Sequence, residues 1–154
     1  MAEVSLSISA FFKMEIRQLK QNEVDEAYLL FNKYSEEVGY VMKPALREAV
    51  KKGCLIGAFL DKLVGVCNFN VRKKDKTLVI YEIAVDEDYR GRGIAREMIT
   101  SLLQICDRIT LKCPVDNDSN YFYKKIGFKL IGVEKGRKRK LFIWLLTKLN
   151  IQKN

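Results

Sequence analysis

The stretch from residue 78 to residue 113 most constrains how this chain can fold, because it predicts a strand, a loop, a helix and a second strand in succession. The first strand, LVIYEIAV, is a Val- and Ile-rich run that is typical of a strand buried on both faces. In the helix, apolar residues recur at intervals of three and four, at 94, 95, 98, 99, 102, 103 and 106. This order of elements predicts an α/β domain.

The loop between the first strand and the helix has the composition of an anion-binding site. Gly91 and Gly93 let a bulky anion approach the backbone, and Arg90 and Arg92 add forked donors that match phosphate oxygens. The helix that follows presents unpaired N–H groups at the positive end of its dipole. A P-loop is excluded because no Lys-Ser or Lys-Thr follows the glycines, and a dinucleotide fingerprint would need glycine where Arg96 stands. The loop therefore predicts a pyrophosphate site of another kind.

Two motifs resemble those of the GNAT superfamily of acyl-CoA-dependent N-acyltransferases. Arg90, Gly93 and Ala95 match its motif [QR]-x-x-G-x-[GA]. The segment SNYFYKKIGF, from Ser119 to Phe128, resembles a second family motif, a helix that ends in Tyr-x-x-x-Gly-Phe. The resemblance implies a GNAT fold of the α/β class, with a mixed, mostly antiparallel sheet of about seven strands, about four helices and a central splayed pair of parallel strands.

The resemblance also implies acetyl-CoA as co-substrate, with no metal. In the family, the backbone of the central strand pairs with the pantetheine arm like an added strand, and the glycine-rich loop binds the pyrophosphate. Asn120 would then hydrogen-bond the pantetheine amides, with Asp116 and Asn117 as alternatives, and Lys124 would reach the 3′-phosphate. The expected cofactor-binding residues are Ile83, Ala84, Val85, Arg90, Gly91, Arg92, Gly93, Ile94, Ala95, Asn120 and Lys124.

The chain contains no histidine, so acid–base chemistry must fall to Glu, Asp, Tyr, Cys or ordered water. Glu82 is a carboxylate within an otherwise apolar strand, where partial burial would raise its pKa toward that of a useful base; the alternative is a Glu that faces solvent. By resemblance, Tyr123 matches the family tyrosine that approaches the thioester sulfur as general acid; the alternative is a buried structural tyrosine. We therefore expect Glu82 and Tyr123 to be the catalytic residues.

The expected reaction is acetyl transfer from acetyl-CoA to a primary amine by direct attack in a ternary complex. A protein N-terminus, a lysine and a small-molecule amine all remain open as acceptors. Tyr34, Tyr40 and Met42 are candidates to line the acceptor site, with the core as the alternative. The basic run EKGRKRK, residues 134–140, is either a solvated turn or a surface that attracts an acidic protein or peptide segment.

The alternative function is a non-catalytic CoA-binding module, or a basic nucleic-acid-binding or regulatory module, on the same fold. The net charge of +9 attracts acidic partners of any kind, so it does not separate CoA from nucleic acid. The sequence contains no helix-turn-helix or zinc-finger spacing, which makes nucleic acid the weaker interpretation. Four cysteines in apolar patterns indicate reduced core residues in a cytoplasmic protein rather than a metal or disulfide site.

A chain of 154 residues suits one domain, which we expect to span 14–154. Residues 1–13 alternate apolar residues with serine, which predicts either a leader or an extra strand that pairs within a dimer. We expect a monomer or a homodimer, and no apolar run approaches the ~20 residues of a membrane span. Asn22 is predicted to cap a helix from 24 to 38 that Gly39 ends, and Pro44 to begin a second helix that Gly53 ends.

Overall fold

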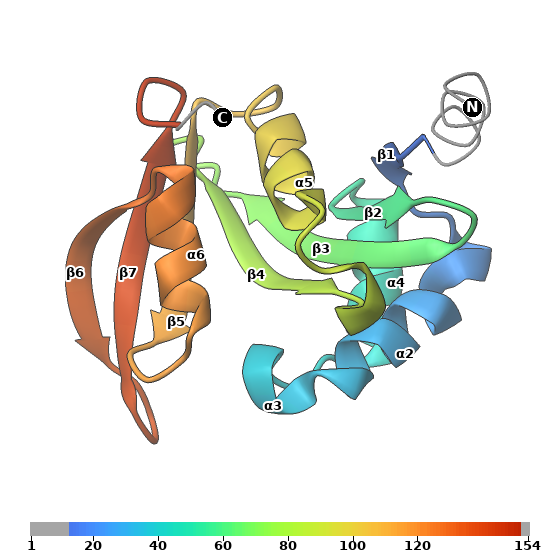
Figure 1. Ribbon diagram of the computed structural model, residues 1–154, viewed down its shortest axis with the longest axis horizontal. Coiled ribbons are helices and arrows are strands. Elements are labelled where there is room, and N and C mark those ends of the chain that lie inside the picture. The colour runs from blue at the N-terminus through green and yellow to red at the C-terminus, as the bar shows by residue number, and fades with distance from the viewer. Residues whose placement is uncertain (1–12, 152–154) are drawn as a thin grey trace, which may run out of the picture.

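Seven strands form one mixed sheet in the computed structural model, which describes residues 13–151 (Figure 1). The strands lie in the order β1-β2-β3-β4-β5-β7-β6, and β4 and β5 are the parallel pair. Their bounds are β1 Glu15–Gln18, β2 Leu55–Phe59, β3 Leu63–Val71, β4 Leu78–Val85, β5 Arg108–Pro114, β6 Lys129–Lys135 and β7 Lys140–Thr147. This topology confirms the predicted fold class. The predicted leader or extra strand lies outside the described residues, apart from Lys13.

Helices cover both faces of the sheet (Figure 1). They are α2 Val24–Lys33, α3 Ser35–Val38, α4 Lys43–Lys51, α5 Ile94–Leu102 and α6 Ser119–Ile126, with the 3-10 turns η1 Gln21–Glu23 and η2 Glu87–Tyr89. Helices α2 and α4 bury Phe31 and Leu46 in one core, whereas α5 and α6 bury Met98 and Ile126 in the other. Within residues 13–151, no helix is both long and apolar enough to cross a membrane.

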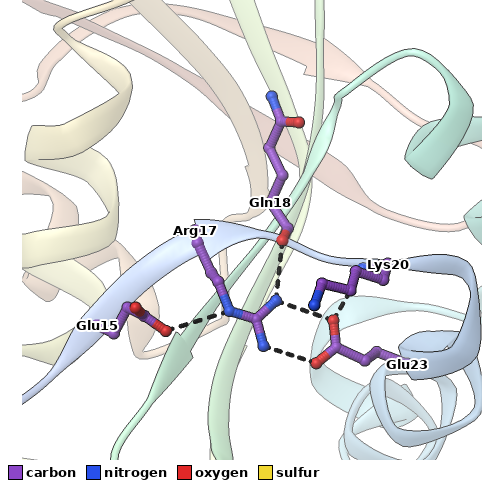
Figure 2. A network of polar contacts seen from close by, with 5 residues as sticks. All are labelled: Glu15, Arg17, Gln18, Lys20 and Glu23. Atoms are coloured by element: carbon purple, nitrogen blue, oxygen red, sulfur yellow. Dashed lines mark hydrogen bonds and ion pairs between the residues drawn. The ribbon is translucent and has the colours of Figure 1, made fainter.

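An ion-pair network fixes the start of α2 on the first strand (Figure 2). The Arg17 guanidinium donates two hydrogen bonds to the Glu23 carboxylate, at 2.9 and 2.7 Å, and a third to Glu15 at 3.2 Å. Glu23 also accepts a hydrogen bond from the backbone N–H of Lys20, and its Arg17 partner lowers its pKa to about 2. The prediction that Asn22 caps this helix is wrong, because Asn22 lies inside η1 and the N-cap residue of α2 is Glu23.

Strands β4 and β5 separate partway along their length, which leaves an opening in the sheet (Figure 1). Their pairing covers only Leu78–Ile80 of β4 and Ile109–Leu111 of β5. On its other side, β4 carries an irregularity at Tyr81, which has no counterpart in the register with β3. Tyr81 is 54% exposed, so the prediction of a strand buried on both faces holds only for the first part of β4. Beyond Ile80, the backbone edge of β4 that faces β5 is left unpaired within the described sheet.

Candidate active site

A cavity of about 790 Å³ occupies the opening between β4 and β5. Its walls come from residues 80–85 of β4, residues 111–114 of β5, the glycine-rich loop, helix α6 and the segment 34–40 that follows α2. Arg139, from the turn between β6 and β7, also lines it. Cofactor and small-molecule sites typically enclose about 300–1,000 Å³, so this cavity has the size that such a ligand requires.

The glycine-rich loop has the conformation that the sequence predicted for an anion site. Gly91 and Gly93 adopt φ angles of +81° and +78°, a region that side chains with a Cβ disfavour. A Cβ built on either glycine would meet no atom within 4 Å, so the space above the backbone is open. Gly93 directly precedes α5, and Ile94 and Ala95 of its first turn line the cavity. Their N–H groups have no partner within the helix, so the loop fits a pyrophosphate.

Of the two arginines of this loop, Arg90 lines the cavity and Arg92 does not. Arg90 donates from Nε to the Val85 carbonyl at 3.0 Å, and its guanidinium lies 4.5 Å from the centre of the Tyr34 ring. The Arg92 guanidinium lies 5.0 Å from the Tyr89 ring and lines a separate cavity. Each guanidinium thus has a cation–π contact within the chain, and Arg90 also has a hydrogen bond, whereas the N–H groups at the start of α5 have no partner within the helix.

Glu82 lines the cavity from β4, next to the irregularity at Tyr81. Asn68 of β3 donates a hydrogen bond from Nδ2 to Glu82 Oε1 at 2.8 Å. Burial raises the pKa of the Glu82 carboxyl above its ordinary value, and the Asn68 hydrogen bond opposes that shift. The predicted base therefore lies in a half-buried environment that suits a proton acceptor.

Tyr123 lines the same cavity from helix α6, and its side chain is buried. Its ring packs edge-on against Phe122 and Phe128, with centroids 5.5 Å away in each case. Burial raises the pKa of its hydroxyl, and the nearby thiols of Cys113 and Cys67 add to that shift. Across residues 13–151 no hydrogen bond engages this hydroxyl, so the interpretation as a tyrosine with a structural partner loses support.

Asn120 does not take the place at the cavity that we predicted. Its Nδ2 donates to the carbonyls of Pro114 and Asn117, both at 2.8 Å, and its Oδ1 accepts from Trp144 Nε1 at 2.8 Å. The amide therefore ties helix α6 to β5 and β7 and is not available to pantetheine, so this prediction is wrong. Lys124 is exposed on α6 and does not line the cavity.

Cys113 also lines the cavity, although its environment does not suit a nucleophile. Burial raises the pKa of its thiol to about 11, and Asp116 adds to the shift, so the thiolate is scarce near neutral pH. Cys67 is buried, whereas Cys54 and Cys106 are partly buried, and all four cysteines are free. In the described part of the chain, no group of three or more His, Cys, Asp or Glu side chains could hold a metal ion.

The segment after α2 lines the cavity on the side opposite α6. The predicted continuous helix from 24 to 38 is wrong, because Tyr34 leaves the helical region and separates α2 from α3. The Tyr34 hydroxyl accepts a hydrogen bond from the backbone N–H of Glu87 at 2.7 Å. Tyr40 lines the cavity and is largely exposed, whereas Met42 does not line it. Sequence analysis named Tyr34 as a lining residue but missed its contact with the loop, because no local pattern encodes a partner 53 residues away.

Comparisons with known proteins agree with this geometry. The sequence model described as "Acetyltransferase (GNAT) family" matches residues 14–128. A sequence comparison with curated proteins finds no match.

Solved structures of three acetyltransferases share the fold. Ard1 from Thermoplasma volcanium superposes with a TM-score of 0.77 at 17% identity, covering 91% of this chain and 99% of that one. An acetyl transferase from Salmonella typhimurium, described as modifying the N-terminal serine of ribosomal protein L7/L12, gives 0.72 at 21% identity, covering 87% and 94%. The PaiA N-acetyltransferase from Thermoplasma acidophilum, solved with coenzyme A, gives 0.73 at 16% identity, covering 88% and 99%.

Proposed function

The chain belongs to the acetyltransferase (GNAT) family, and on that premise we propose that it transfers the acetyl group of acetyl-CoA to a primary amine by direct attack in a ternary complex. One observation carries the proposal: a single cavity is lined by the anion-binding loop, the free edge of β4, Glu82 and Tyr123. The cavity therefore offers a place for the cofactor and for proton transfer side by side.

The backbone of the chain would hold the cofactor. The N–H groups at the start of α5 and the loop formed by Gly91 and Gly93 would bind the pyrophosphate. The unpaired edge of β4 at Ile83, Ala84 and Val85 would bind the pantetheine arm through main-chain hydrogen bonds, as an added strand. Neither contact depends on the Arg90 or Arg92 side chains, which have other partners.

Glu82 and Tyr123 would carry the two proton transfers. The acceptor amine must lose a proton when its nitrogen forms the new bond to the acetyl carbon, and Glu82 would accept that proton directly or through water. The bond from that carbon to sulfur breaks in the same exchange, and Tyr123 would donate its hydroxyl proton to the leaving sulfur. Glu82 would thus act on the attacking nitrogen and Tyr123 on the leaving sulfur of the same displacement.

Acetyl-CoA is expected to raise the melting temperature of the wild-type protein. A ligand at 100 times its dissociation constant adds about 2.7 kcal/mol to the free energy of unfolding. Gly93→Asp is expected to abolish the rise, because it adds a negative charge where the pyrophosphate would bind. Gly93→Asn is the matched control, since Asn tolerates a positive φ and adds similar bulk without charge. A thermal scan of all three proteins with acetyl-CoA is the measurement, and a wild type that does not shift would reject the proposal.

We further propose that the acceptor enters beside the turn between β6 and β7 and carries acidic residues. Arg139 lines the cavity and lies 3.6 Å from Asp116, and Arg137 and Lys138 precede it in the same turn. Two proteins with this fold are described as acetyltransferases of ribosomal proteins, one of them acting on an N-terminal serine, which favours a peptide acceptor.

Replacing Arg137, Lys138 and Arg139 together by Gln is expected to raise KM for peptides with acidic residues near their N-terminus and to leave acetyl-CoA affinity nearly unchanged. The effect should shrink with added salt, because exposed charges are screened over about 8–10 Å at 0.1–0.15 M. Replacing Lys73, Lys74 and Lys76 by Gln is the control, since it removes the same charge from a turn that does not line the cavity. Equal KM values in the two triple variants would identify the 137–139 cluster as a solvated turn.

A further inference from the structure

All four residues of helix α3 line the cavity, and the helix follows directly after α2 in the chain (Figure 1). It is only four residues long, Ser35–Val38, and Tyr34 separates it from the end of α2 at Lys33. Side chains or backbone groups of this segment contact both sides of the opening. We call residues 34–38 the brace.

On the β4 side, the brace holds the turn that leads into the glycine-rich loop. The Tyr34 side chain is buried, and its hydroxyl accepts from the N–H of Glu87 at the start of η2, at 2.7 Å. The Tyr34 ring supports the Arg90 guanidinium, whose Nε donates to the carbonyl of Val85 at the end of β4. The Glu37 carboxylate lies 3.9 Å from the same guanidinium. The path from the end of β4 to the first glycine is thus fixed from one side.

On the β5 side, the brace reaches the loop that begins α6. Asn117 donates from Nδ2 to the Glu37 carbonyl at 3.3 Å, and its Oδ1 accepts from the N–H of Ser119 at 2.8 Å. Asn117 follows β5 by three residues and lines the cavity. Glu37 therefore contacts Arg90 on one side and Asn117 on the other.

We propose that Tyr34 is a positioning residue for acetyl-CoA, and that the brace sets the spacing between the two sides of the cavity; this rests on the proposed function. Sheet hydrogen bonds do not hold the two sides together, because the pairing of β4 with β5 ends at Ile80. A site that is already ordered binds more tightly than one that must be ordered by its ligand. Cofactor affinity thus depends on a segment that supplies none of the proposed cofactor contacts.

Tyr34→Phe tests the hydroxyl contact alone, because it keeps the ring beneath Arg90. The loss of one buried hydrogen bond is expected to weaken CoA binding roughly 3- to 10-fold, measured by titration calorimetry with CoA. The matched control is Tyr28→Phe on the preceding helix α2, a partly buried tyrosine near Lys43, which should bind CoA like the wild type. Melting temperatures of the variants and the wild type without ligand report whether a change in CoA affinity comes from a loss of fold stability instead of a change at the site.

Asn117→Asp tests the other side of the brace. The new carboxylate still accepts from Ser119, whereas the donor to the Glu37 carbonyl is lost. We expect Asn117→Asp to weaken CoA binding. Its effect should not be additive with that of Tyr34→Phe, because both variants loosen the same brace and the second change removes little that the first has left. A simple charge repulsion between the new carboxylate and CoA would instead add fully to the Tyr34→Phe effect.

The outcomes separate the two proposals. A wild type that does not bind CoA would overturn the proposed function itself. A wild type that binds CoA, together with a Tyr34→Phe protein of equal affinity, would overturn the positioning role of Tyr34 alone. Full additivity of the two variants would overturn the brace as a connected unit. A reduced affinity in both variants, without additivity and with an unchanged Tyr28→Phe control, would support it.

Discussion

Tyr123→Phe is expected to lower kcat by about 10²–10⁴-fold, because general acid catalysis contributes a factor of that size. The substitution removes the hydroxyl that would protonate the leaving sulfur and keeps the ring that packs against Phe122 and Phe128. CoA affinity and the melting temperature should barely change, since no hydrogen bond in the described structure engages this hydroxyl. A release assay for free CoA thiol, run with saturating acetyl-CoA and amine, measures kcat.

The control for this experiment is Tyr121→Phe on the same helix, at a largely exposed tyrosine that does not line the cavity. It should leave kcat unchanged. A Tyr123→Phe enzyme with wild-type kcat at every pH would remove tyrosine from the mechanism and leave water as the proton donor.

The raised pKa of Tyr123 bears on how it would act. A hydroxyl whose pKa is raised by burial stays protonated throughout the physiological range, so the proton is available at each turnover. The same burial would raise the pKa of the leaving thiol in the cavity, because it disfavours any thiolate there, as it does at Cys113. Burial would therefore raise both pKa values, so the pKa difference that opposes proton transfer from Tyr123 to the leaving sulfur would not widen.

Local patterns predicted single elements, whereas the sheet of about seven strands was implied by the family resemblance. The apolar run of β4 and the three- and four-residue spacing in α5 both depend on near neighbours. The splayed parallel pair did not come from those patterns, and its prediction rested on the family resemblance. Tyr34 shows where prediction from local patterns stops, because the break between α2 and α3 accompanies a hydrogen bond to Glu87, which lies far along the chain.

The predictions for the site failed where a side chain had a stronger partner elsewhere. Asn120 has the residue type and the spacing for an amide contact, but Trp144 and two backbone carbonyls use its amide completely. Arg90 fits the family motif and lines the cavity, and its guanidinium lies on the Tyr34 ring, a contact that no local pattern encodes. Sequence identifies which groups can donate, whereas tertiary packing decides what they donate to.

Glu82→Gln is expected to lower kcat/KM most at low pH and least at high pH. The variant keeps the shape of the side chain and an oxygen that can accept from Asn68, and it removes the base. Without the base, only the fraction of acceptor that is already neutral reacts, and this fraction rises with pH. Neutralising a lysine amine at pH 7 costs about 4–5 kcal/mol, whereas an N-terminal amine costs about 1 kcal/mol. The size of the defect at pH 7 therefore also reports the class of acceptor.

The same substitution is expected to stabilise the fold at neutral pH. Folding raises the pKa of Glu82 above its ordinary 4.5, so the native state binds the proton more tightly than the unfolded chain does. Wild-type stability contributed by this group is present below pH 4.5 and is lost as pH rises through the raised pKa. Gln stays neutral, so Glu82→Gln should melt higher than wild type at pH 7 and alike at the acid end.

Melting curves and pH–rate profiles of the two proteins together test the role of Glu82. A variant that melts higher and reacts more slowly would mean that the charge is kept for chemistry at a cost in stability, as expected of an active-site group. A variant that melts higher and reacts like the wild type at every pH would leave Glu82 as a half-buried carboxylate without a catalytic role. The acceptor amine would then have to lose its proton to water without help from a side chain, which fits only an amine with a low pKa, such as a protein N-terminus.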